Sequence, residues 1–352
     1  FILYMENNYF KATDVKLTKY ITIPAEFINE QFKRFHRYPI RQRFETMTDY
    51  ILEMMQLQYN LTVSTPEKNQ LKKEIKKMFA GNNDLQIYKD FFEWIGKPEM
   101  FKTRKNRILE YADLAPLAYL HIALNGNNAQ SYVKHLLIDE MQDYSPIQYK
   151  VIQKLYPCRK TILGDTSQSV NPYGSSTADM IQKAFATGEI MKLCKSYRST
   201  FEITSFAQKI QPNNELEPII RHGEHPKILP FKNTEEEEEE IQGIADLVNS
   251  FRNSHYTSLG IICKTESQAK ELVQKFQIYA NDISLLSNQS SAYVKGIIIT
   301  SAHMAKGLEF DEVIIPQTDD KNYHSNIDKS MLYVAATRAM HKLTLTYSVS
   351  SP

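Results

Sequence analysis

The sequence predicts an α/β fold of parallel sheets with helices on both faces, preceded by a mainly helical region. Three observations support this prediction. Residues 1–100 are rich in Lys, Glu, Gln, Met and aromatic residues, and their apolar positions have helical spacing. From about residue 101, short apolar runs alternate with amphipathic segments. A second block with this alternation begins near residue 186, which favours two blocks of parallel sheet.

The N-terminal region contains two segments that read as helices. Residues 41–59 form one of them. Residues 66–81 place apolar side chains at helical intervals, and Gly81 is expected to end that helix. We find no catalytic pattern in this region. We therefore expect residues 1–100 to form a helical accessory region.

The first α/β block begins near residue 101. We predict helices over 111–124 and 145–156, and strands over 132–139 and 160–165. Ser145 is expected to be the N-cap of its helix, with Pro146 in the first turn, where the missing N–H of proline costs nothing. Strand, helix and strand in this order suggest a parallel sheet.

The second block continues the alternation to the end of the chain. We predict strands within 190–199 and over 258–264, 295–303, 311–317 and 343–348, and helices over 200–210, 234–251, 267–280 and 329–342. The six successive glutamates at 235–240 are interpreted as the first turns of the helix over 234–251, where negative charge suits the helix dipole, and not as a binding site.

Composition excludes several classes of protein. The chain is 42% hydrophobic and 24% charged, which is ordinary for a soluble globular protein. Lys and Arg number 42 against 41 Asp and Glu, so net charge gives no argument for a nucleic-acid partner. No apolar run is long enough to cross a bilayer. The three cysteines, Cys158, Cys194 and Cys263, lack metal-ligand spacing and fit a reducing, cytoplasmic setting.

Two adjacent carboxylates, Asp139 and Glu140, end the predicted strand over 132–139. In open α/β sheets, ligands bind beyond the carboxyl ends of the strands. One carboxylate there can help to hold a Mg²⁺ ion that bridges phosphates, and the other can orient or deprotonate an attacking water. For an isolated pair, a surface acidic turn would be the better interpretation.

Other polar side chains accompany this pair. Gln168 lies in a polar turn after the strand over 160–165, where its amide can both donate and accept hydrogen bonds. Arg198 lies in a polar turn of the second block, and Arg338 lies inside the predicted helix over 329–342. Two arginines that reach a γ-phosphate from across a cleft would form an arginine-finger arrangement.

The sequence contains, in this order, the segments DEMQD, GDTSQSV, KSYRST, TSAHMAKGLEFDEVI and LYVAATRA. Together they resemble motifs II to VI of the UvrD/Rep-type superfamily I helicases, over roughly residues 132–345. Motifs in a fixed order are a far more specific signal than any one motif. Within that family the chain is most similar to the HelD branch, helicase-like ATPases that bind bacterial RNA polymerase. The similarity to this branch lies in YADLAPLAYLHIAL, LLIDEMQDYSPIQY, KSYRSTFEITSFAQKI and AHMAKGLEFDEVI.

The resemblance implies RecA-like sheets of the P-loop NTPase type and a site for ATP and Mg²⁺ between two RecA-like domains. The domains would be a helical accessory or insertion region at 1–100, a partial first RecA-like domain at 101–188 and a second one at 189–352. The resemblance assigns Mg²⁺ to Asp139, the role of catalytic base to Glu140, sensing of the γ-phosphate to Gln168, and contacts with that phosphate to Arg198 and Arg338. Asp143 is expected to make a structural hydrogen bond between loops.

The resemblance also implies roles for residues around the nucleotide. Glu309 would bind the ribose, and Gly307 would let the backbone come close to the nucleotide. Tyr197 could pack near the nucleotide, with a place in the core as the alternative. Thr300 and His303 would lie on the nucleic-acid side and couple it to ATP, with a satisfied turn histidine as the alternative for His303.

The printed sequence lacks the phosphate-binding loop G-x-x-x-x-G-K-[ST] that such enzymes use. The only Gly-Lys pair, Gly96-Lys97, is followed by Pro98 and has no suitably spaced glycine before it. We therefore expect a C-terminal part of a longer protein, whose missing N-terminal segment carries the loop and completes the first sheet. Without the loop little would hold the β- and γ-phosphates, so the chain alone is predicted not to hydrolyse ATP.

Two functions are consistent with these motifs. The first is the C-terminal part of an ATP-dependent superfamily I DNA helicase or translocase, with DNA favoured over RNA as partner. The alternative is a HelD-type remodelling factor that binds RNA polymerase and has little or no unwinding activity. The near-neutral net charge favours the alternative, because a strand-tracking motor often carries a basic groove with aromatic platforms. A nuclease or phosphatase would need more metal ligands than the sequence offers.

Overall fold

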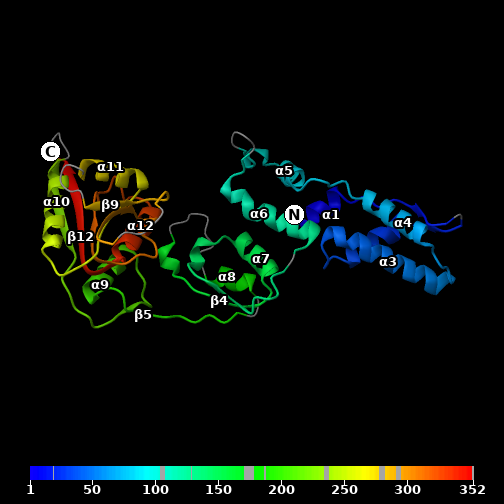
Figure 1. Cartoon of the computed structure of the whole chain (residues 1–352), viewed down its shortest axis with the longest axis horizontal. Coiled ribbons are helices and arrows are strands. Elements are labelled where there is room, and N and C mark those ends of the chain that lie inside the picture. Colours follow the sequence, from blue (N-terminus) through cyan, green and yellow to red (C-terminus); the bar gives the residue numbers. More distant parts are fainter. Residues whose placement is uncertain are drawn as a thin grey trace. The chain divides into compact units, whose positions relative to one another are not determined.

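The computed structural model separates the chain into two compact units (Figure 1). The first unit comprises Phe1–Ile138 and Ser145–Ile162, and the second comprises Asp139–Tyr144 and Leu163–Pro352. The domain boundaries predicted near residues 100 and 188 remain a prediction. The structure describes residues 1–18, 20–103, 108–127, 129–169, 178–185, 188–233, 238–276, 282–290 and 295–350.

The N-terminal part of the first unit is mainly helical, as predicted. Its elements are α1 (Ile2–Asn8), the antiparallel pair β1 (Val15–Lys16) and β2 (Thr22–Ile23), α2 (Ala25–Arg34), α3 (Ile40–Tyr59), α4 (Thr65–Lys77), α5 (Asp84–Trp94) and η1 (Pro98–Met100). A capping box between Ser64 and Glu67 starts α4. The expectation that Gly81 ends this helix was wrong. The helix ends at Lys77 because Phe79 leaves it to form a β-bridge with Phe10.

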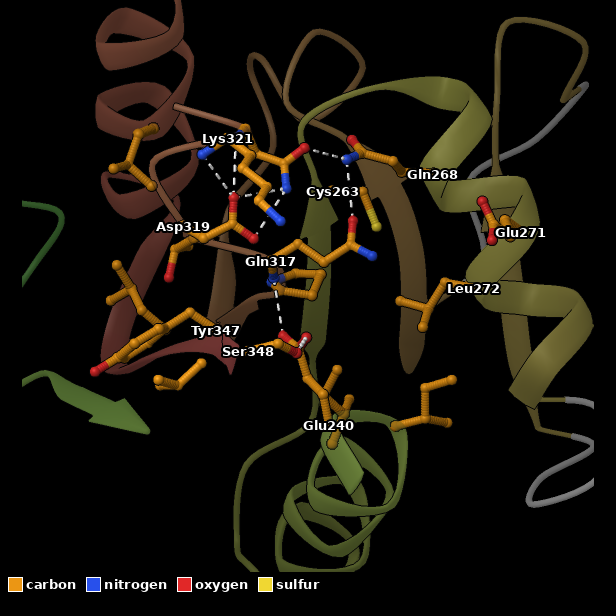
Figure 2. Close-up of a pocket in the computed structure, with 18 of the residues that line it drawn as sticks. Glu240, Cys263, Gln268, Glu271, Leu272, Gln317, Asp319, Lys321, Tyr347 and Ser348 are labelled. Carbon is orange, nitrogen blue, oxygen red and sulfur yellow. Dashed lines mark hydrogen bonds between the residues drawn. The ribbon is translucent and has the colours of Figure 1, made fainter. Parts of the chain in front are cut away.

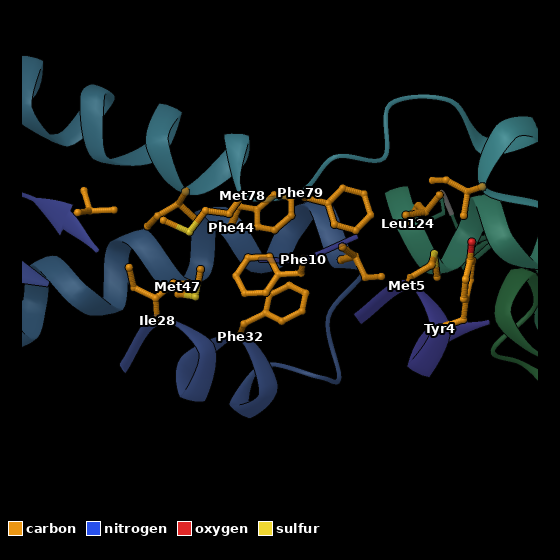
Figure 3. Close-up of a cluster of buried hydrophobic side chains, with 14 of the residues drawn as sticks. Tyr4, Met5, Phe10, Ile28, Phe32, Phe44, Met47, Met78, Phe79 and Leu124 are labelled. Atoms are coloured by element: carbon orange, nitrogen blue, oxygen red, sulfur yellow. The ribbon is translucent and has the colours of Figure 1, made fainter. Parts of the chain in front are cut away.

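Aromatic side chains fill the core of this helical part (Figure 3). Phe10 stacks on Phe32 with ring centroids 3.7 Å apart, and Phe44 lies 6.1 Å from Phe32. All three rings are buried. Short helices are marginal alone in water, so this packing supplies most of their stability.

A helix and a strand–helix–strand motif complete the first unit. Its elements are α6 (Tyr111–Asn125), β3 (His135–Ile138), α7 (Pro146–Leu155) and β4 (Arg159–Ile162). Ser145 and Gln148 form a capping box at the start of α7, with Pro146 in the first turn as predicted. The strands β3 and β4 are parallel, as the sequence predicted. Among the described residues this sheet has two strands, and Leu137 on β3 is 70% exposed.

The second unit is built around a large parallel sheet that has six strands among the described residues, in the order β7-β12-β11-β8-β10-β9. The strands are β7 (Lys227–Asn233), β8 (Leu259–Cys263), β9 (Ile283–Leu286), β10 (Ile297–Ser301), β11 (Phe310–Ile315) and β12 (Ala339–Ser350). The helices are α8 (Ala178–Ala184), α9 (Phe201–Ile210), α10 (Glu238–Arg252), α11 (Glu266–Phe276) and α12 (Asn326–Ala336). A parallel pair, β5 (Lys195–Ser196) and β6 (Glu217–Pro218), lies outside the large sheet.

Both faces of the large sheet are buried. Ile261 of β8 and Ile299 of β10 pack with the helices α10 and α11 in one core. Their neighbours Ile262 and Ile298 pack with α9 and α12 in another core. Side chains that alternate between two buried faces explain why these strands read as continuous apolar runs. The predicted fold is therefore confirmed: an α/β protein with RecA-like parallel sheets covered by helices on both faces.

Two local predictions need correction. The helix predicted over 329–342 ends at Ala336, and β12 already begins at Ala339, because Ala339 pairs with Phe310 of β11. Arg338 therefore lies in a turn and not inside a helix. The strand β7 was not predicted, since its lysines and proline weaken the apolar pattern; it is an edge strand, where proline is tolerated. Residues 277–280 of another predicted helix lie outside the described residues.

In the part of the chain that the structure describes, no helix combines the length and the apolar character needed to cross a bilayer.

Candidate functional site

The acidic doublet lies in the turn that follows β3. Asp139 is exposed, and its Oδ1 accepts a hydrogen bond from the backbone N–H of Glu140 at 2.8 Å. Glu140 has φ +52° and ψ +50°, a left-handed conformation that is uncommon for residues other than glycine. Such backbone strain persists only where surrounding contacts hold it, and it clusters at functional sites.

Two side chains hold the Glu140 carboxylate. Nε2 of Gln142, which is fully buried in η3 (Met141–Asp143), donates to Glu140 Oε2 at 2.6 Å. The Lys306 ammonium lies 3.4 Å from the same oxygen and donates to Asp143 Oδ1 at 2.6 Å. The Lys306 side chain is 7% exposed, so its charge depends on these two carboxylates for compensation. Asp143 thus links two loops, in keeping with the structural role expected for it.

The loop after β4 packs tightly against this turn. Gln142 Oε1 accepts from the backbone N–H of Asp165 at 3.2 Å, and the Met141 N–H donates to the Leu163 carbonyl at 2.8 Å. A Cβ at Gly164 would lie 2.7 Å from the Met141 backbone nitrogen, closer than real Cβ atoms approach. Glycine at this position therefore permits the contact between the two loops.

Gln168 and Arg338 contact each other directly. Gln168 ends η4 (Thr166–Gln168), and its Nε2 donates to Asp165 Oδ2 at 3.0 Å. Arg338 Nη2 donates to Gln168 Oε1 at 2.5 Å, and Arg338 Nε donates to the Val334 carbonyl at 3.1 Å. Arg338 is 1% exposed, so almost all of its guanidinium is removed from water.

Charges around Arg338 come from several loops of the second unit. The pKa of Arg338 is lowered to about 10, mainly by burial and also by the nearby positive charge of Arg198, while the carboxylates of Glu140, Glu309 and Asp165 oppose that change. Glu140 lies after β3 and Asp165 lies after β4. Arg198 and Glu309 come from the second α/β block, which begins near residue 186. Three of the residues predicted to act on one nucleotide, Glu140, Arg198 and Glu309, therefore lie within electrostatic reach of Arg338.

Arg198 and Glu309 form an ion pair, in which Arg198 Nε donates to Glu309 Oε1 at 2.6 Å. Both side chains stay partly exposed, at 33% and 48%. Gly307 has φ +80°, and open space surrounds the position of a Cβ there. Tyr197 is 69% exposed, which excludes the alternative that it is a core residue. This arrangement leaves the edges of the cluster accessible to a ligand.

The structure does not bring Thr300 and His303 to this cluster. Thr300 lies near the carboxyl end of β10, fully buried, and its hydroxyl donates to the Leu286 carbonyl at 2.9 Å. His303 follows the same strand and is exposed. Glu309 and Arg338 instead precede β11 and β12, at the amino ends of those strands.

Sequence reasoning missed Lys306 and Gln142. Both stand inside quoted motifs, Gln142 between the carboxylates of DEMQD and Lys306 directly before Gly307. A lysine next to a glycine at a predicted turn is a weak signal, because most such lysines are solvated. Only the fold brings Lys306 to Asp143, which lies 163 residues away in the sequence.

The acidic residues suit a magnesium ion that arrives with its nucleotide. Among the described residues, no group of three or more His, Cys, Asp or Glu side chains could hold a metal ion. Magnesium in nucleotide sites is typically bound by one or two carboxylates together with substrate phosphates. The exposed carboxylate of Asp139 fits that pattern, whereas Glu140 is held by Gln142 and Lys306.

Two models of known protein families match the chain. Residues 6–187 match the model of the UvrD/REP helicase N-terminal domain, and residues 277–350 match the model of the UvrD-like helicase C-terminal domain.

Individual relatives carry related names. The chain is 28% identical over 226 residues to the ATP-dependent DNA helicase Rep of Buchnera aphidicola subsp. Schizaphis graminum, covering 59% of this chain and 33% of that protein. It is 26% identical to the same-named protein of Buchnera aphidicola subsp. Baizongia pistaciae, over 55% of this chain and 32% of that protein. It is 30% identical to DNA helicase II of Haemophilus influenzae, over 38% of this chain and 20% of that protein. The chain thus spans about a third or less of the length of these curated relatives.

Proposed function

The chain belongs to the UvrD/Rep family of helicases, and from that premise we propose that it is the C-terminal part of an ATP-dependent DNA helicase or translocase. The observation that carries the proposal is the contact between Gln168 and Arg338, with Glu140 within electrostatic reach. ATP with Mg²⁺ is the proposed substrate complex, and DNA is favoured over RNA as the nucleic-acid partner. The free thiols Cys158, Cys194 and Cys263 suit a cytoplasmic setting.

We assign to the carboxylates the roles that the resemblance to the helicase motifs implies. Bound Mg²⁺ would neutralise developing charge on the phosphates, and Asp139 would hold it. Glu140 orients the attacking water and accepts its proton. Gln142 fixes the orientation of that carboxylate through its hydrogen bond to Oε2. Lys306 stabilises the negative charge of the turn until nucleotide binds.

Gln168 and the two arginines would respond to the γ-phosphate. Without nucleotide, Arg338 is paired with Gln168, and Arg198 is paired with Glu309. A γ-phosphate offers anionic acceptors to both guanidinium groups, which form stronger hydrogen bonds with an anion than with a neutral amide. When Arg198 turns to that phosphate, Glu309 becomes available for the ribose hydroxyls. Gly307 and the exposed Tyr197 would line the adjacent part of the nucleotide site.

Coupling to nucleic acid would run through β10. Thr300 is buried in that strand and acts through it, because its hydroxyl is bonded to β9 and cannot reach a ligand. His303 is exposed on the segment that follows and is the proposed contact with nucleic acid. Lys306, Gly307 and Glu309 lie farther along the same segment. A shift of this segment would therefore change the nucleic-acid and nucleotide contacts together.

We further propose that the printed chain alone does not turn over ATP. None of its residues forms the loop G-x-x-x-x-G-K-[ST], whose backbone N–H groups and lysine hold the β- and γ-phosphates. The partner that supplies this loop would be an N-terminal segment of a longer polypeptide. A phosphate-release assay on the printed chain with Mg-ATP tests this proposal. Steady turnover would contradict it.

A HelD-type function is the second candidate. The motif segments closest to that branch and the formal net charge of +1 favour a factor that binds RNA polymerase and remodels its complex. A pull-down with RNA polymerase and a strand-displacement assay on the longer polypeptide distinguish the two candidates. Strand displacement without polymerase binding supports the helicase. Stable polymerase binding with no displacement supports the remodelling factor.

A further inference from the structure

The loop that carries Arg198 is tied to the start of β12 by two side chains. Ser199 follows Arg198 directly, is 4% exposed and donates its hydroxyl hydrogen to the Ala339 carbonyl at 2.6 Å. Nη2 of Arg221 donates to the Arg198 carbonyl and also to the Met340 carbonyl, the second at 3.4 Å. One guanidinium nitrogen thus bridges the loop of Arg198 and the first residues of β12.

These contacts lie directly beside Arg338. Ala339 and Met340 follow it in the sequence, and its own carbonyl accepts from the Phe310 N–H of β11 at 3.0 Å. Three successive carbonyls of the chain therefore accept hydrogen bonds from three separate segments. These bonds fix the backbone at the point from which the Arg338 side chain extends, and they fix the loop of Arg198 against the same point.

The strand β12 is a firm point of attachment. It pairs with β7 on one side and with β11 on the other. Near its carboxyl end, Glu240 of α10 accepts from Thr346 Oγ1 at 2.6 Å and from Ser348 Oγ at 2.9 Å. Figure 2 shows Glu240 beside Ser348 on the wall of a cavity of about 840 Å³. A group that is attached to a strand held at both ends is positioned more precisely than a group on a free loop.

The segment that carries Arg221 is itself attached to the Arg198 loop. The Arg221 carbonyl accepts from the N–H of Phe201, the first residue of α9, at 2.8 Å. A Cβ at Gly223 would lie 2.7 Å from Thr200 Cγ2, so glycine permits the close approach of this segment to the start of α9. The hydrogen bonds from the Arg221 guanidinium are charge-assisted, and such bonds are stronger than those between neutral groups. Arg221 thus reinforces a contact that the backbone already makes.

The two arginines of the site need this support because their charges repel each other. The positive charge of Arg198 contributes to the lowered pKa of Arg338. The Arg198 side chain is 33% exposed, and repulsion favours movement of its loop away from the buried guanidinium. A fixed backbone keeps both charges close to one point before an anion arrives. The binding of that anion then does not have to bring the two groups together.

We propose that Arg221 and Ser199 are positioning residues for the two arginines assigned to the γ-phosphate. They hold the loop of Arg198 on β12, so that Arg198 and Arg338 present a fixed pair of guanidinium groups to the phosphate. The inference rests on the proposed ATPase function, and it adds residues that do not touch the nucleotide. Arg221 acts through Arg198, and its removal displaces that side chain without removing a phosphate contact.

The steady-state ATPase of the longer polypeptide tests the role of Arg221. We expect Arg221→Ala to lower kcat by about 10- to 10²-fold, because a misplacement of about 1 Å is enough for such a loss, and to leave KM for ATP within about threefold. Arg252→Ala is the matched control, since this arginine pairs with Asp282 at the end of α10, and it should change neither constant. An unchanged kcat would overturn the proposal, and a rise in KM alone would make Arg221 a direct contact of the nucleotide instead.

A double variant shows whether Arg221 acts through Arg198. In the background of Arg198→Ala, we expect Arg221→Ala to lower kcat by less than about threefold, because the side chain that it positions is gone. Losses that multiply in the double variant would overturn the proposal. The single variant Arg198→Ala separates this inference from the proposed function. If Arg198→Ala lowers kcat and Arg221→Ala does not, only the inference fails. If Arg198→Ala has no effect, the role proposed for Arg198 in ATP hydrolysis fails together with the inference.

Hydrogen exchange on the printed chain tests the attachment without ATP. Ser199→Ala and Arg221→Ala should each raise the exchange rates of the backbone amides over residues 196–203 by about threefold to tenfold, because each removes a hydrogen bond that holds the loop. The amides of β8 should exchange as in the parent chain. Unchanged exchange over 196–203 in either variant would overturn the proposal. An equal rise in β8 would also overturn it, because it would show a general loss of stability.

Discussion

Arg338 Nη2 donates a hydrogen bond to Gln168 Oε1 at 2.5 Å, although 170 residues separate the two positions in sequence. The guanidinium is buried, and among the described residues its hydrogen bonds go to carbonyl, amide and hydroxyl oxygens. A buried cation whose hydrogen-bond acceptors are neutral forms stronger hydrogen bonds when an anionic acceptor binds to it. We infer that a γ-phosphate oxygen competes with Gln168 for this guanidinium.

Glu140→Gln should separate hydrolysis from binding. The amide keeps the shape of the side chain but cannot accept the proton of the attacking water. In the longer polypeptide that carries the phosphate-binding loop, we expect phosphate release to fall by about 10²–10⁴-fold. The affinity for a fluorescent ATP analogue should stay within about threefold. Glu215→Gln, at an exposed position outside the site, is the matched control. Undiminished turnover in Glu140→Gln would exclude Glu140 as the base.

Removing Asp143 and removing Lys306 should have different effects on the free energy of unfolding. Asp143→Ala removes the nearer carboxylate and leaves an ammonium that is 7% exposed with its remaining contact at 3.4 Å. Lys306→Met leaves carboxylates that are 36% and 39% exposed and that water can reach. We expect a loss of about 2 kcal/mol in the first variant and less than about 1 kcal/mol in the second. Urea unfolding of both variants checks the order, and the reverse order would contradict it.

Stability should depend on pH through Asp328. Burial alone would raise the pKa of this carboxyl, but the Lys264 ammonium at 2.6 Å and the Ser325 N–H at 2.9 Å hold the pKa well below its ordinary value of 3.8. The folded state therefore binds this proton less readily than the unfolded state. The resulting stability is fully present above about pH 3.8 and is lost as the pH falls through the lower, folded-state pKa.

Asp328→Asn measures this contribution. Near neutral pH we expect the variant to be less stable by about 3 kcal/mol, because it leaves Lys264 without its buried counter-charge. The difference between the parent chain and the variant should shrink as the pH is lowered below 3.8. Unfolding curves at a series of pH values give the comparison. A difference that stays constant down to strongly acidic pH would contradict the assignment.

The helical part of the first unit should depend on its aromatic core. Phe44 is 3% exposed, and Leu57 on the same helix is 75% exposed. We expect Phe44→Ala to lower the free energy of unfolding by about 3–5 kcal/mol, since it loses apolar burial and leaves a cavity. Leu57→Ala should change it by less than about 0.5 kcal/mol. Chemical unfolding followed by circular dichroism tests the pair. Equal losses would mean that Phe44 does not belong to the core.

Local patterns predicted the elements that carry the site. The strand before Asp139, the capped helix starting at Pro146 and the strand before Gly164 all form as predicted, because apolar runs, caps and turn residues act over short distances. The position of Arg338 was predicted less well. Its segment has helical spacing, but pairing of Ala339 with Phe310 extends β12 into that segment. Tertiary pairing here overrides local propensity.

Contacts between distant segments could not be read from the sequence. The approach of Lys306 to Asp143 requires the loop after β10 and the turn after β3 to meet, which only the assembled fold determines. Glu240 illustrates the same limit. In sequence it belongs to a run of glutamates that suggests a solvated helix end, yet it is 8% exposed and accepts hydrogen bonds from β12. A run of charged residues in the sequence shows only the local composition. Whether one of its side chains is buried depends on which strands the helix packs against in the fold.

The central claim is that Gln168 and Arg338 act together on one nucleotide. A double-mutant cycle on the DNA-stimulated ATPase of the longer polypeptide tests it most directly, with Gln168→Ala, Arg338→Ala and the double variant compared with the parent. We expect each single substitution to lower kcat by about 10²–10³-fold. The kcat of the double variant should lie at most about tenfold below that of the less active single variant. Losses that multiply fully in the double variant would contradict the claim, because they would mean that the two side chains act independently.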